Sequence, residues 1–511
     1  MSWDSGYVTD IDYTHGHYTE LDPHRAQFAL TYAGIKPLDI DAACELGFGQ
    51  GVSLNINAAG SDIKWYGTDF NPNQALNAKQ VAKTHQGSLQ IFDDDFLTLL
   101  ENENLPDFDF ISLHGIWSWI SDENRTVISE FIRRKLKIGG VVYISYNTLP
   151  GWNQMIPIRN LMMDLMEAST PPQDLSSSRV GRTLNIMEDL TKLGLKHLAA
   201  NPAGQKKLES LVSQNKNYVA HEYFNRDWMA MNFSDISSIL QNSKINYVAS
   251  ANLLENIDVL NLSNEQAAYL SGLESIKLRE TLRDYMINQT FRRDYWVKGS
   301  VRFSAPERIA ALDKFRLIAA KSLKNFDFKL KCNIGEANLT ESVYAPIIEL
   351  MSDHELRTVK EIRQALVKTN DISVQQILEA LYILVGSNTL ILSYDAQHSK
   401  KVNHQASGLN KHLMAKSIEG NHVNFLVSPL TGSGIPVGRI DQIFIHLLQT
   451  KVKDVETLAT KTQSILEQRG HSILKDGKAV PTGEELFLEL SSRAKMFLEQ
   501  AVPIYKKLHI L

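Results

Sequence analysis

Apolar runs and helically spaced apolar residues alternate along the first 150 or so residues of the chain. After Ser121, for example, Ile128, Phe131 and Ile132 follow a helical spacing that we expect to end at the Gly139-Gly140 pair. The apolar runs predict five strands, at 39–46, 63–68, 88–92, 108–113 and 141–147. Strands that alternate with helices predict an α/β fold, in which a mostly parallel sheet binds its ligand at the carboxyl ends of the strands.

The pattern changes beyond residue 152. Helical patterns at 156–168 and 183–197, separated by proline- and glycine-containing breaks, predict a helical insertion over 153–215. A helix at 233–240 and strands at 245–249 and 293–297 follow, and we expect this region, 216–300, to complete a seven-stranded sheet. The insertion is then expected to act as a lid over the ligand crevice or as a contact between subunits.

The C-terminal half is expected to be mostly helical. Three helical stretches and then a strand at 389–392 predict a winged helix within a linker and domain at 301–395. The segment 340–395 contains four basic and eight acidic residues, which is the wrong sign of charge for binding phosphates. Protein docking is therefore favoured over DNA binding. The last domain, 396–511, shows helical patterns at 441–448 and 484–498 and no group of residues that indicates chemistry.

Three alternate glycines lie where the first strand passes into a helix. Gly47, Gly49 and Gly51 follow Glu45, at a turn that needs positive φ and close approach of the backbone to a ligand. A nicotinamide dinucleotide site would need a further glycine where Val52 stands. The alternate spacing instead favours S-adenosylmethionine as the cofactor.

Acidic residues at the next strand ends support that hypothesis. Asp69 ends the second strand and can accept hydrogen bonds from both ribose hydroxyls, and Asp94 or Asp95 can accept one from the adenine amino group. Glu45, Phe96 and His114 complete the expected cofactor site. The alternatives are an acidic turn that only caps the helix beginning near Phe96, and a histidine that only stabilises its loop.

Three tryptophans follow the fourth and fifth strands, where a substrate must enter. Trp117, Trp119 and Trp152 can be packing residues, but an aromatic wall at this place can also bind a cation. His221-Glu222 lacks the second histidine of a zinc helix, because Asn225 stands there, so no metal site is expected. His221 is instead assigned to a pocket wall or to the start of a helix.

Several motifs carry a specific resemblance. His114–Trp119 and Ser145–Trp152 resemble bacterial methyltransferases that bear a methyltransferase regulatory domain, a family that includes rickettsial protein lysine methyltransferases. The resemblance continues through Tyr218–Phe224 and Asn288–Asp294, and covers roughly residues 1–300. It implies a Rossmann-like, seven-stranded methyltransferase sheet, S-adenosylmethionine as cofactor and a protein lysine as acceptor.

A lysine acceptor must be neutral before it can attack a methyl group, although its ordinary pKa is near 10.4. An apolar aromatic slot lowers that pKa by penalising the charged form. Trp119, Tyr146 and Asn147 are therefore our catalytic candidates, the last two as groups that orient the amine. The residues expected to contact substrate are Trp117, Trp152, His221 and Tyr223.

Composition narrows the class of protein further. Hydrophobic residues make up 43% and charged residues 22% of the 511 residues, with a net charge of -5, so a folded protein without a nucleic-acid partner is expected. Two cysteines suit a reducing cytoplasm, and no apolar run is long enough for a membrane span. A methyltransferase for a small molecule or sugar, and a cofactor-binding regulatory protein without turnover, remain alternatives. A homodimer through the insertion is possible.

Overall fold

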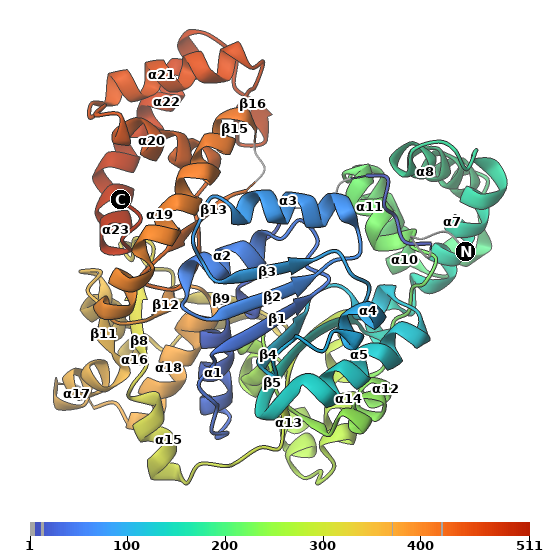
Figure 1. Ribbon diagram of the computed structural model, residues 1–511, viewed down its shortest axis with the longest axis horizontal. Helices are drawn as coiled ribbons and strands as arrows, with labels where there is room; N and C mark the ends of the chain where they lie inside the picture. Colours follow the sequence, from blue (N-terminus) through green and yellow to red (C-terminus); the bar gives the residue numbers. More distant parts are fainter. Residues whose placement is uncertain (1–5, 12–14, 370, 421–422) are drawn as a thin grey trace.

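The computed structural model describes residues 6–11, 15–369, 371–420 and 423–511. Its centre is a seven-stranded sheet of order β3-β2-β1-β4-β5-β7-β6, in which β7 runs antiparallel to both neighbours (Figure 1). The strands are β1 (Ala42–Leu46), β2 (Lys64–Thr68), β3 (Leu89–Phe92), β4 (Phe108–Leu113), β5 (Leu136–Asn147), β6 (Ile245–Ser250) and β7 (Phe291–Lys298). The order reverses between β1 and β4, which places the ligand crevice of such a sheet at their carboxyl ends.

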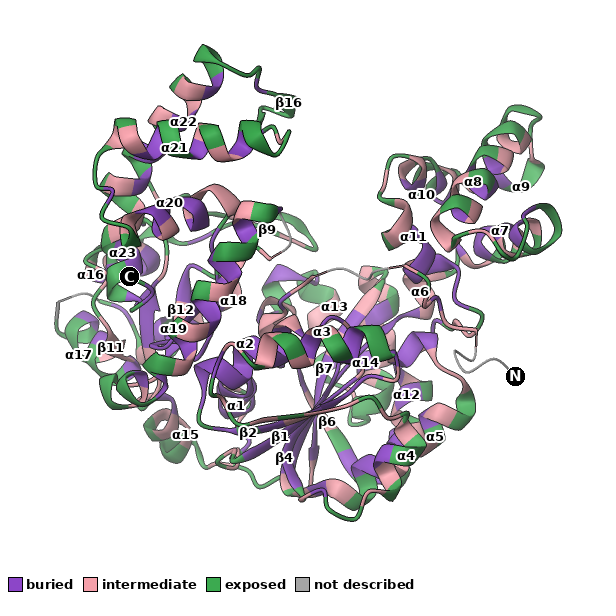
Figure 2. Ribbon diagram, turned by 45° about the horizontal axis from the view of Figure 1, so that its top comes forward, coloured by how far each residue is buried: buried purple, intermediate pink, exposed green. Residues whose placement is uncertain are grey.

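Helices cover both faces of the sheet, because successive residues of a strand point to opposite sides. In β4, Phe110 belongs to one buried apolar cluster and Ile111 to the other. One face carries α1 (Pro23–Tyr32), α2 (Val52–Gly60) and α3 (Pro72–Ala82); the other carries α4 (Phe96–Glu101), α5 (Asp122–Lys135), α12 (Phe233–Leu240) and α14 (Ile276–Ile287). Figure 2 accordingly shows the central strands as buried. The expected α/β sheet of seven strands, completed after an insertion, is confirmed.

The boundary between α5 and β5 differs from the expected one. The helix ends at Lys135, and β5 begins at Leu136, which pairs with Phe108 of β4. Gly139, expected to stop the helix, instead lies inside the strand with φ +87°. The glycine pair allows an irregular step in the register of β4 and β5, so that the sheet continues where the sequence suggested a loop.

The insertion forms a lobe of its own beside the sheet (Figure 1). Its helices are α6 (Leu149–Trp152), α7 (Ile156–Ser169), α8 (Ser176–Lys192), α9 (Lys196–Ala199), α10 (Pro202–Val212) and α11 (Lys216–Tyr223). The helix expected at 183–197 is α8, which ends earlier because Gly194 turns the chain with φ +86°. Val219 and Tyr223 of α11 belong to the apolar cluster of this lobe. The helical unit therefore extends past residue 215.

The middle region contains four helices and a small antiparallel sheet of order β11-β8-β12. Its elements are α15 (Ala305–Leu312), β8 (Arg316–Ala319), the hairpin β9 (Lys329–Cys332) and β10 (Gly335–Asn338), α16 (Glu341–Met351), β11 (Arg357–Thr358), α17 (Val359–Thr369), α18 (Val374–Gly386) and β12 (Leu390–Ser393). Tyr382 of α18 stacks on Tyr32 of α1 with ring centroids 3.6 Å apart. Helices α16, α17 and α18 and strand β12 correspond to the three helical stretches and the strand that the sequence predicts. The winged-helix interpretation stays a prediction.

The C-terminal lobe is built around α19 (Ala396–Glu419), a helix of 24 residues that the sequence analysis did not identify. Val402, Ala406, Leu409 and Leu413 form its buried stripe, interrupted by many polar residues. The other elements are β13 (Phe425–Ser428), β14 (Ser433–Pro436), α20 (Arg439–Gln449), α21 (Val455–Gln468), β15 (Leu474–Lys475), β16 (Lys478–Ala479), α22 (Glu484–Met496) and α23 (Val502–Lys507). The expected helices at 441–448 and 484–498 correspond to α20 and α22.

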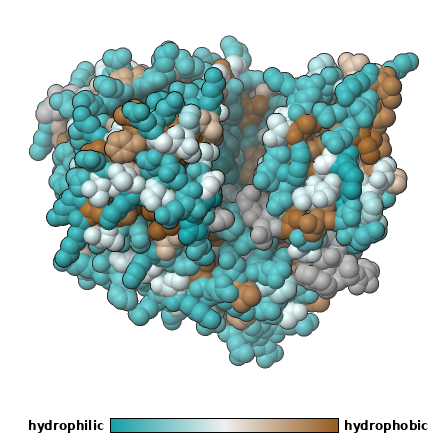
Figure 3. Space-filling view, turned by 90° about the horizontal axis from the view of Figure 1, so that it is seen from above, coloured by the Kyte–Doolittle hydropathy of each residue, from teal (hydrophilic) through white to brown (hydrophobic). Residues whose placement is uncertain are grey.

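Seen from above, the helical insertion and the C-terminal lobe stand on either side of a groove (Figure 3). Between them α3 crosses the edge of the sheet (Figure 1). Among the described residues no helix is both long and apolar enough to cross a membrane.

Candidate functional site

The loop between β1 and α2 adopts the backbone conformations that its glycines allow. The angle φ is +70° at Gly47, +58° at Gly49 and +72° at Gly51. A Cβ on Gly47 would lie 2.4 Å from Cδ1 of Ile116, and one on Gly51 would lie 2.5 Å from Cβ of Ala78. Glycine at 47 therefore lets Ile116 pack directly against this loop in a pocket wall, and glycine at 51 lets α2 pack closely on α3.

Asp69 lies at the carboxyl end of β2 and turns its carboxylate toward this loop. Its Oδ2 accepts a hydrogen bond from the amide of Gly49 at 2.8 Å, and its Oδ1 accepts one from the amide of Asn71 at 3.0 Å. In the amide orientation that satisfies both side chains, Gln74 donates to both oxygens at 3.0 Å. Burial raises the pKa of Asp69 to about 7, although the two backbone hydrogen bonds favour the ionised form.

Glu45, two residues before Gly47, is a second buried carboxyl group, with 4% of its surface exposed. Burial, and then the charge of Asp69, raise the pKa of Glu45 to about 8. Its Oε2 has no hydrogen-bond partner among the described residues. A buried acceptor without a partner costs free energy, which a ligand with N–H groups would recover.

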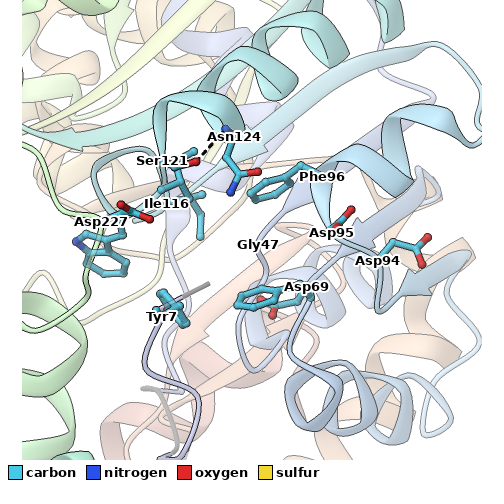
Figure 4. A pocket seen from close by; sticks show the side chains of 14 residues that line it. Tyr7, Gly47, Asp69, Asp94, Asp95, Phe96, Ile116, Ser121, Asn124 and Asp227 are labelled. Carbon is cyan, nitrogen blue, oxygen red and sulfur yellow. Dashed lines mark hydrogen bonds between the residues drawn. The ribbon is translucent and has the colours of Figure 1, made fainter. Parts of the chain in front are cut away.

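These groups line two connected pockets at the carboxyl ends of the strands. The inner pocket is lined by Tyr18, Glu45, Gly49, Ser53, Gln74 and His114, among others. The outer pocket is lined by Phe70, Asp94, Asp95, Phe96, Asn124 and Asp227, among others (Figure 4). Tyr7, Gly47, Asp69, Ile116 and Trp119 line both. In the close view, Phe96, Ile116 and Asn124 lie across the space from Tyr7 and Asp69.

The three aspartates that follow β3, Asp93 to Asp95, make different contacts. Asp93 pairs with Lys79 at 2.8 Å, outside the residues that line the pockets. Asp95 accepts a hydrogen bond from the amide of Thr98 at 2.8 Å and so caps α4, as the alternative interpretation proposed, while still lining the outer pocket. Burial and its two acidic neighbours raise the pKa of Asp94, which lines the same pocket. Asp94 is thus the pocket-lining aspartate of the cluster that does not cap α4.

His114 follows β4 and is held from two sides. Its Nδ1 lies 2.7 Å from the hydroxyl of Tyr143, and its ring stacks on Tyr18 with centroids 3.7 Å apart. Burial lowers the pKa of His114 to about 4, so the imidazole is neutral near pH 7. A neutral histidine fits the wall of a pocket that receives a cationic ligand.

The two tryptophans that follow His114 lie in different surroundings. Trp119 lines both pockets. Trp117, two residues earlier, is fully buried in the apolar cluster beneath the sheet, and its indole nitrogen has no partner among the described residues. The geometry supports Trp119 as a pocket residue and gives Trp117 a packing position.

Tyr146 and Asn147 end β5, but their side chains lie on opposite faces of the sheet. The Tyr146 hydroxyl donates to Oδ2 of Asp294 at 2.7 Å, its ring is buried in the same apolar cluster as Ile144 and Trp296, and it lines neither pocket. This position does not support an amine-orienting role for Tyr146. Asn147 is also buried, and its backbone N–H donates to the Ser118 hydroxyl at 2.8 Å.

The remaining substrate candidates meet where the insertion joins the core. Trp152 packs against Tyr223 and Trp228, with ring centroids 5.4 and 4.9 Å apart. His221 is buried, and its ring centroid lies 5.9 Å from that of Tyr7, a residue of both pockets. The structure therefore brings these aromatic residues next to the pockets rather than into their walls. Across the described ranges no group of histidine, cysteine and acidic side chains is arranged to hold a metal ion.

Several lining residues were not identified from the sequence. Two of them stand next to residues that the sequence did indicate. Phe70 directly follows Asp69, and Asn124 lies in the first turn of α5, after its cap Ser121. Tyr7 and Tyr18 come from the N-terminal segment, where no periodicity or motif marks them. This segment contacts residues that are distant in sequence; for example, the Val8 backbone N–H donates to Oδ1 of Asn225 at 3.0 Å. Only the folded chain reveals such contacts.

The arrangement defines the ligand that would fit. Asp69 offers two carboxylate oxygens to a pair of hydroxyls, while Glu45 offers a buried acceptor to a cationic amine. Phe70, Phe96 and Ile116 offer apolar walls for a flat ring in the outer pocket. A nucleoside that carries a charged amino-acid tail satisfies all three features.

Residues 215–298 match a family model described as the predicted methyltransferase regulatory domain. An uncharacterised protein of Synechocystis, sll1526, is 34% identical over 515 residues, which cover 100% of both chains. An uncharacterised protein of Rickettsia prowazekii, RP789, is 25% identical over 336 residues, 62% of this chain and 58% of that one.

Among solved structures, the chain is similar to PKMT2 from Rickettsia typhi. The structure of that protein in complex with AdoHcy superposes with a TM-score of 0.68 at 17% identity and covers 98% of this chain and 99% of the other. A second structure of the same protein gives a TM-score of 0.65, also at 17% identity, over 96% and 100% of the two chains. At this identity the likeness establishes the shared fold over nearly the whole length.

Proposed function

The chain belongs to the family of the Synechocystis protein sll1526, and from its fold and pocket we propose that it is an S-adenosylmethionine-dependent methyltransferase. The observation that carries the proposal is the meeting of Glu45, Gly47, Gly49 and Asp69 in one pocket. The AdoHcy complex of the rickettsial protein, which shares the fold, supports the choice of cofactor.

The pocket fits this cofactor by its own chemistry. Asp69 would receive the ribose hydroxyls, and the partnerless Oε2 of Glu45 would receive the α-ammonium group. Asp94 would accept a hydrogen bond from the adenine amino group, with Phe96 and Ile116 on the walls. The missing Cβ at Gly47 lets Ile116 pack directly against the glycine loop in the pocket wall.

We propose further that the acceptor is the side-chain amine of a protein lysine. S-adenosylmethionine, when bound, supplies a methyl group on a positively charged sulfur. The acceptor ammonium must first release a proton to solvent; its lone pair then forms the N–C bond as the S–C bond breaks, and that electron pair stays on sulfur. The chain's own task is to align the amine and exclude water, for which the apolar side of Trp119 is suited.

The lysine proposal rests on the size of the site's surroundings and on the rickettsial resemblance. The insertion and the C-terminal lobe flank a groove (Figure 3), and a small substrate would not require these two additional parts of the chain. A small-molecule or sugar acceptor, and a cofactor-binding protein without turnover, are the alternatives that the experiments below separate. The cytoplasmic location remains a prediction from the sequence.

Calorimetry with S-adenosylhomocysteine tests the cofactor site. We expect the wild-type protein to bind it and the Asp69→Asn variant to bind roughly ten- to a hundredfold more weakly, because a charged hydrogen-bond acceptor is lost. Asp93→Asn is the matched control, since Asp93 pairs with Lys79 outside the pocket walls. Binding of a pyridine dinucleotide in place of S-adenosylhomocysteine would contradict the proposal.

The acceptor is tested by mass spectrometry of proteins from cells with and without this chain. Methylated lysines that disappear with the chain, and return with the wild type but not with Asp69→Asn, are the expected result. A changed small molecule without protein methylation would move the function to the first alternative. Cofactor binding with no new methyl group anywhere would leave the second.

A further inference from the structure

Four tyrosines and a glutamate gather where the N-terminal segment meets α11. Tyr7 and Tyr18 come from the N-terminal segment, whereas Tyr218, Glu222 and Tyr223 come from α11. Tyr218 and Glu222 are four residues apart, so they lie on the same face of that helix. We call these five residues the tyrosine cluster.

The cluster adjoins the proposed cofactor pocket. Tyr7 lines both pockets, and its ring lies between Phe70 at 5.8 Å and His221 at 5.9 Å, measured between ring centroids. Tyr18 lines the inner pocket and covers the ring of His114. Both rings therefore belong to the pocket wall as well as to the tyrosine cluster.

The outer side of the cluster is open to solvent. Tyr218 has 38% of its surface exposed, and Glu222 is partly exposed, whereas Tyr223 is buried beneath them. The Glu222 carboxylate acts electrostatically on the hydroxyls of Tyr7, Tyr218 and Tyr223. The Tyr218 hydroxyl in turn interacts with that of Tyr18. Residues on the surface and residues in the pocket are thus linked through one carboxylate.

The charge of the cluster follows from these contacts. Burial, then Glu222 and Tyr18, raise the pKa of Tyr218 to about 12, and burial also raises the pKa of Tyr7 and Tyr223 well above their ordinary values. These three phenols are therefore neutral near pH 7. Electron-rich ring faces around a single carboxylate attract a compact cation, and a lysine ammonium matches that chemistry.

We propose that the tyrosine cluster is the receiving site for the acceptor ammonium, with Tyr218 and Glu222 at its entrance and Tyr7 and Tyr18 at its inner end. The inference rests on the proposed function, because it names the path by which a lysine side chain reaches the inner pocket. Glu222 binds the ammonium group while it is still charged. The two inner rings then replace its water with apolar surface, which favours loss of the proton before transfer.

The test uses n-butylamine, charged near pH 7, as a mimic of the lysine side chain, and n-butanol as its neutral counterpart. The full chain is labelled with 3-fluorotyrosine, saturated with S-adenosylhomocysteine and titrated while fluorine NMR is recorded. The Tyr218→Phe variant assigns the Tyr218 resonance and keeps its ring. We expect saturable shifts of that resonance with butylammonium in the wild-type protein, and none with butanol.

Variants decide whether the cluster is responsible. Glu222→Gln and Tyr218→Ala should each weaken butylammonium binding at least tenfold while S-adenosylhomocysteine still binds as in the wild type. Tyr269→Ala and Glu188→Gln replace exposed residues outside the cluster and should change neither. The Tyr18 and Tyr7 resonances report binding in Tyr218→Ala, and calorimetry of cofactor binding shows that each variant is folded.

The outcomes separate the two proposals. No saturable butylammonium shift in the wild type, or equal binding in the variants, overturns the receiving site while the cofactor site stands. If wild-type protein fails to bind S-adenosylhomocysteine, the proposed function falls and takes this inference with it.

Discussion

At the scale of single residues, the inner pocket is defined by two carboxyl groups with different partners. Asp69 is held by backbone amides of Gly49 and Asn71, whereas Oε2 of Glu45 has no partner in the described structure. Burial raises the pKa of both groups, to about 7 and about 8. A ligand that brings a positive charge to Glu45 would favour its ionised form and lower its pKa.

This difference predicts a pH-dependent affinity for the cofactor. Because the pKa of Glu45 is about 8 in the free protein and falls on binding an ammonium group, affinity is highest above pH 8 and decreases as pH falls. Between pH 8 and pH 6, calorimetry with S-adenosylhomocysteine should show a loss approaching tenfold per pH unit.

Glu45→Gln provides the comparison for that titration, because it keeps the shape of the side chain and removes its charge. Its binding should be weaker at pH 8 and much less dependent on pH. A steep pH dependence that survives in Glu45→Gln would assign the effect to another group, of which Asp69 is the first candidate.

At the scale of elements, a buried ion cluster joins β7 to α14. The Arg292 guanidinium binds Asp294 at 2.9 Å, Asp284 at 2.7 Å and Glu280 at 3.1 Å, and it lies 4.5 Å from the centre of the Phe233 ring. Burial raises the pKa of Asp284 to about 7 and that of Asp294 to about 6. One guanidinium thus compensates three carboxyl groups.

Removing that guanidinium should destabilise the sheet edge strongly. We expect Arg292→Met to lower the free energy of unfolding by about 3–5 kcal/mol at pH 7, because the buried carboxyl groups lose their compensating charge. The loss should diminish at lower pH, where protonation neutralises Asp284 and Asp294.

Urea denaturation followed by circular dichroism measures this change. Arg133→Met is the control, since Arg133 pairs with Glu130 on the surface and such pairs contribute little. Equal stability of Arg292→Met and the wild type would show that the cluster is replaceable by apolar packing.

At the scale of the whole molecule, the C-terminal lobe is seated directly on the helix that follows the glycine loop. A Cβ on Gly60, at the end of α2, would lie 2.3 Å from the carbonyl oxygen of Gly432. His398 lies 3.1 Å from the Gly60 carbonyl, and Lys401 pairs with Asp62 at 2.6 Å. The proposed cofactor site and this lobe therefore share α2, whose first residue follows Gly51.

A single methyl group should loosen that contact. Gly60→Ala places its Cβ against backbone, which cannot rotate away, so we expect a loss of about 1–3 kcal/mol. Scanning calorimetry should show earlier unfolding, and limited proteolysis should cut the C-terminal lobe sooner.

Gly181→Ala is the matched substitution, because nothing lies within 4 Å of its Cβ in the middle of α8. Alanine is favoured over glycine inside a helix, so this variant should be unchanged or slightly more stable. Similar behaviour of the two variants would mean that the lobe does not depend on close packing at Gly60.

The seven-stranded sheet and the chemistry at its strand ends could be predicted from local patterns of residues. A strand or helix with one buried face repeats apolar residues at its own period, so the spacing identifies the element. Glu45 and Gly47 lie in one strand-turn-helix pattern, and Asp69 follows the next strand, so their proximity could be inferred as well. Helix α19 was not predicted because many polar residues interrupt its buried apolar stripe.

Which aromatic residues line the pocket depends on long-range packing, and no local pattern predicted it. Trp117 and Trp119 stand two residues apart, yet one is packed beneath the sheet and the other lines the site. Tyr146 faces the Arg292 cluster, whereas Tyr7 and Tyr18 reach the pocket from the N-terminal segment. Such contacts join residues far apart in the chain, and the direction of a side chain at a strand end depends on packing that no local pattern records.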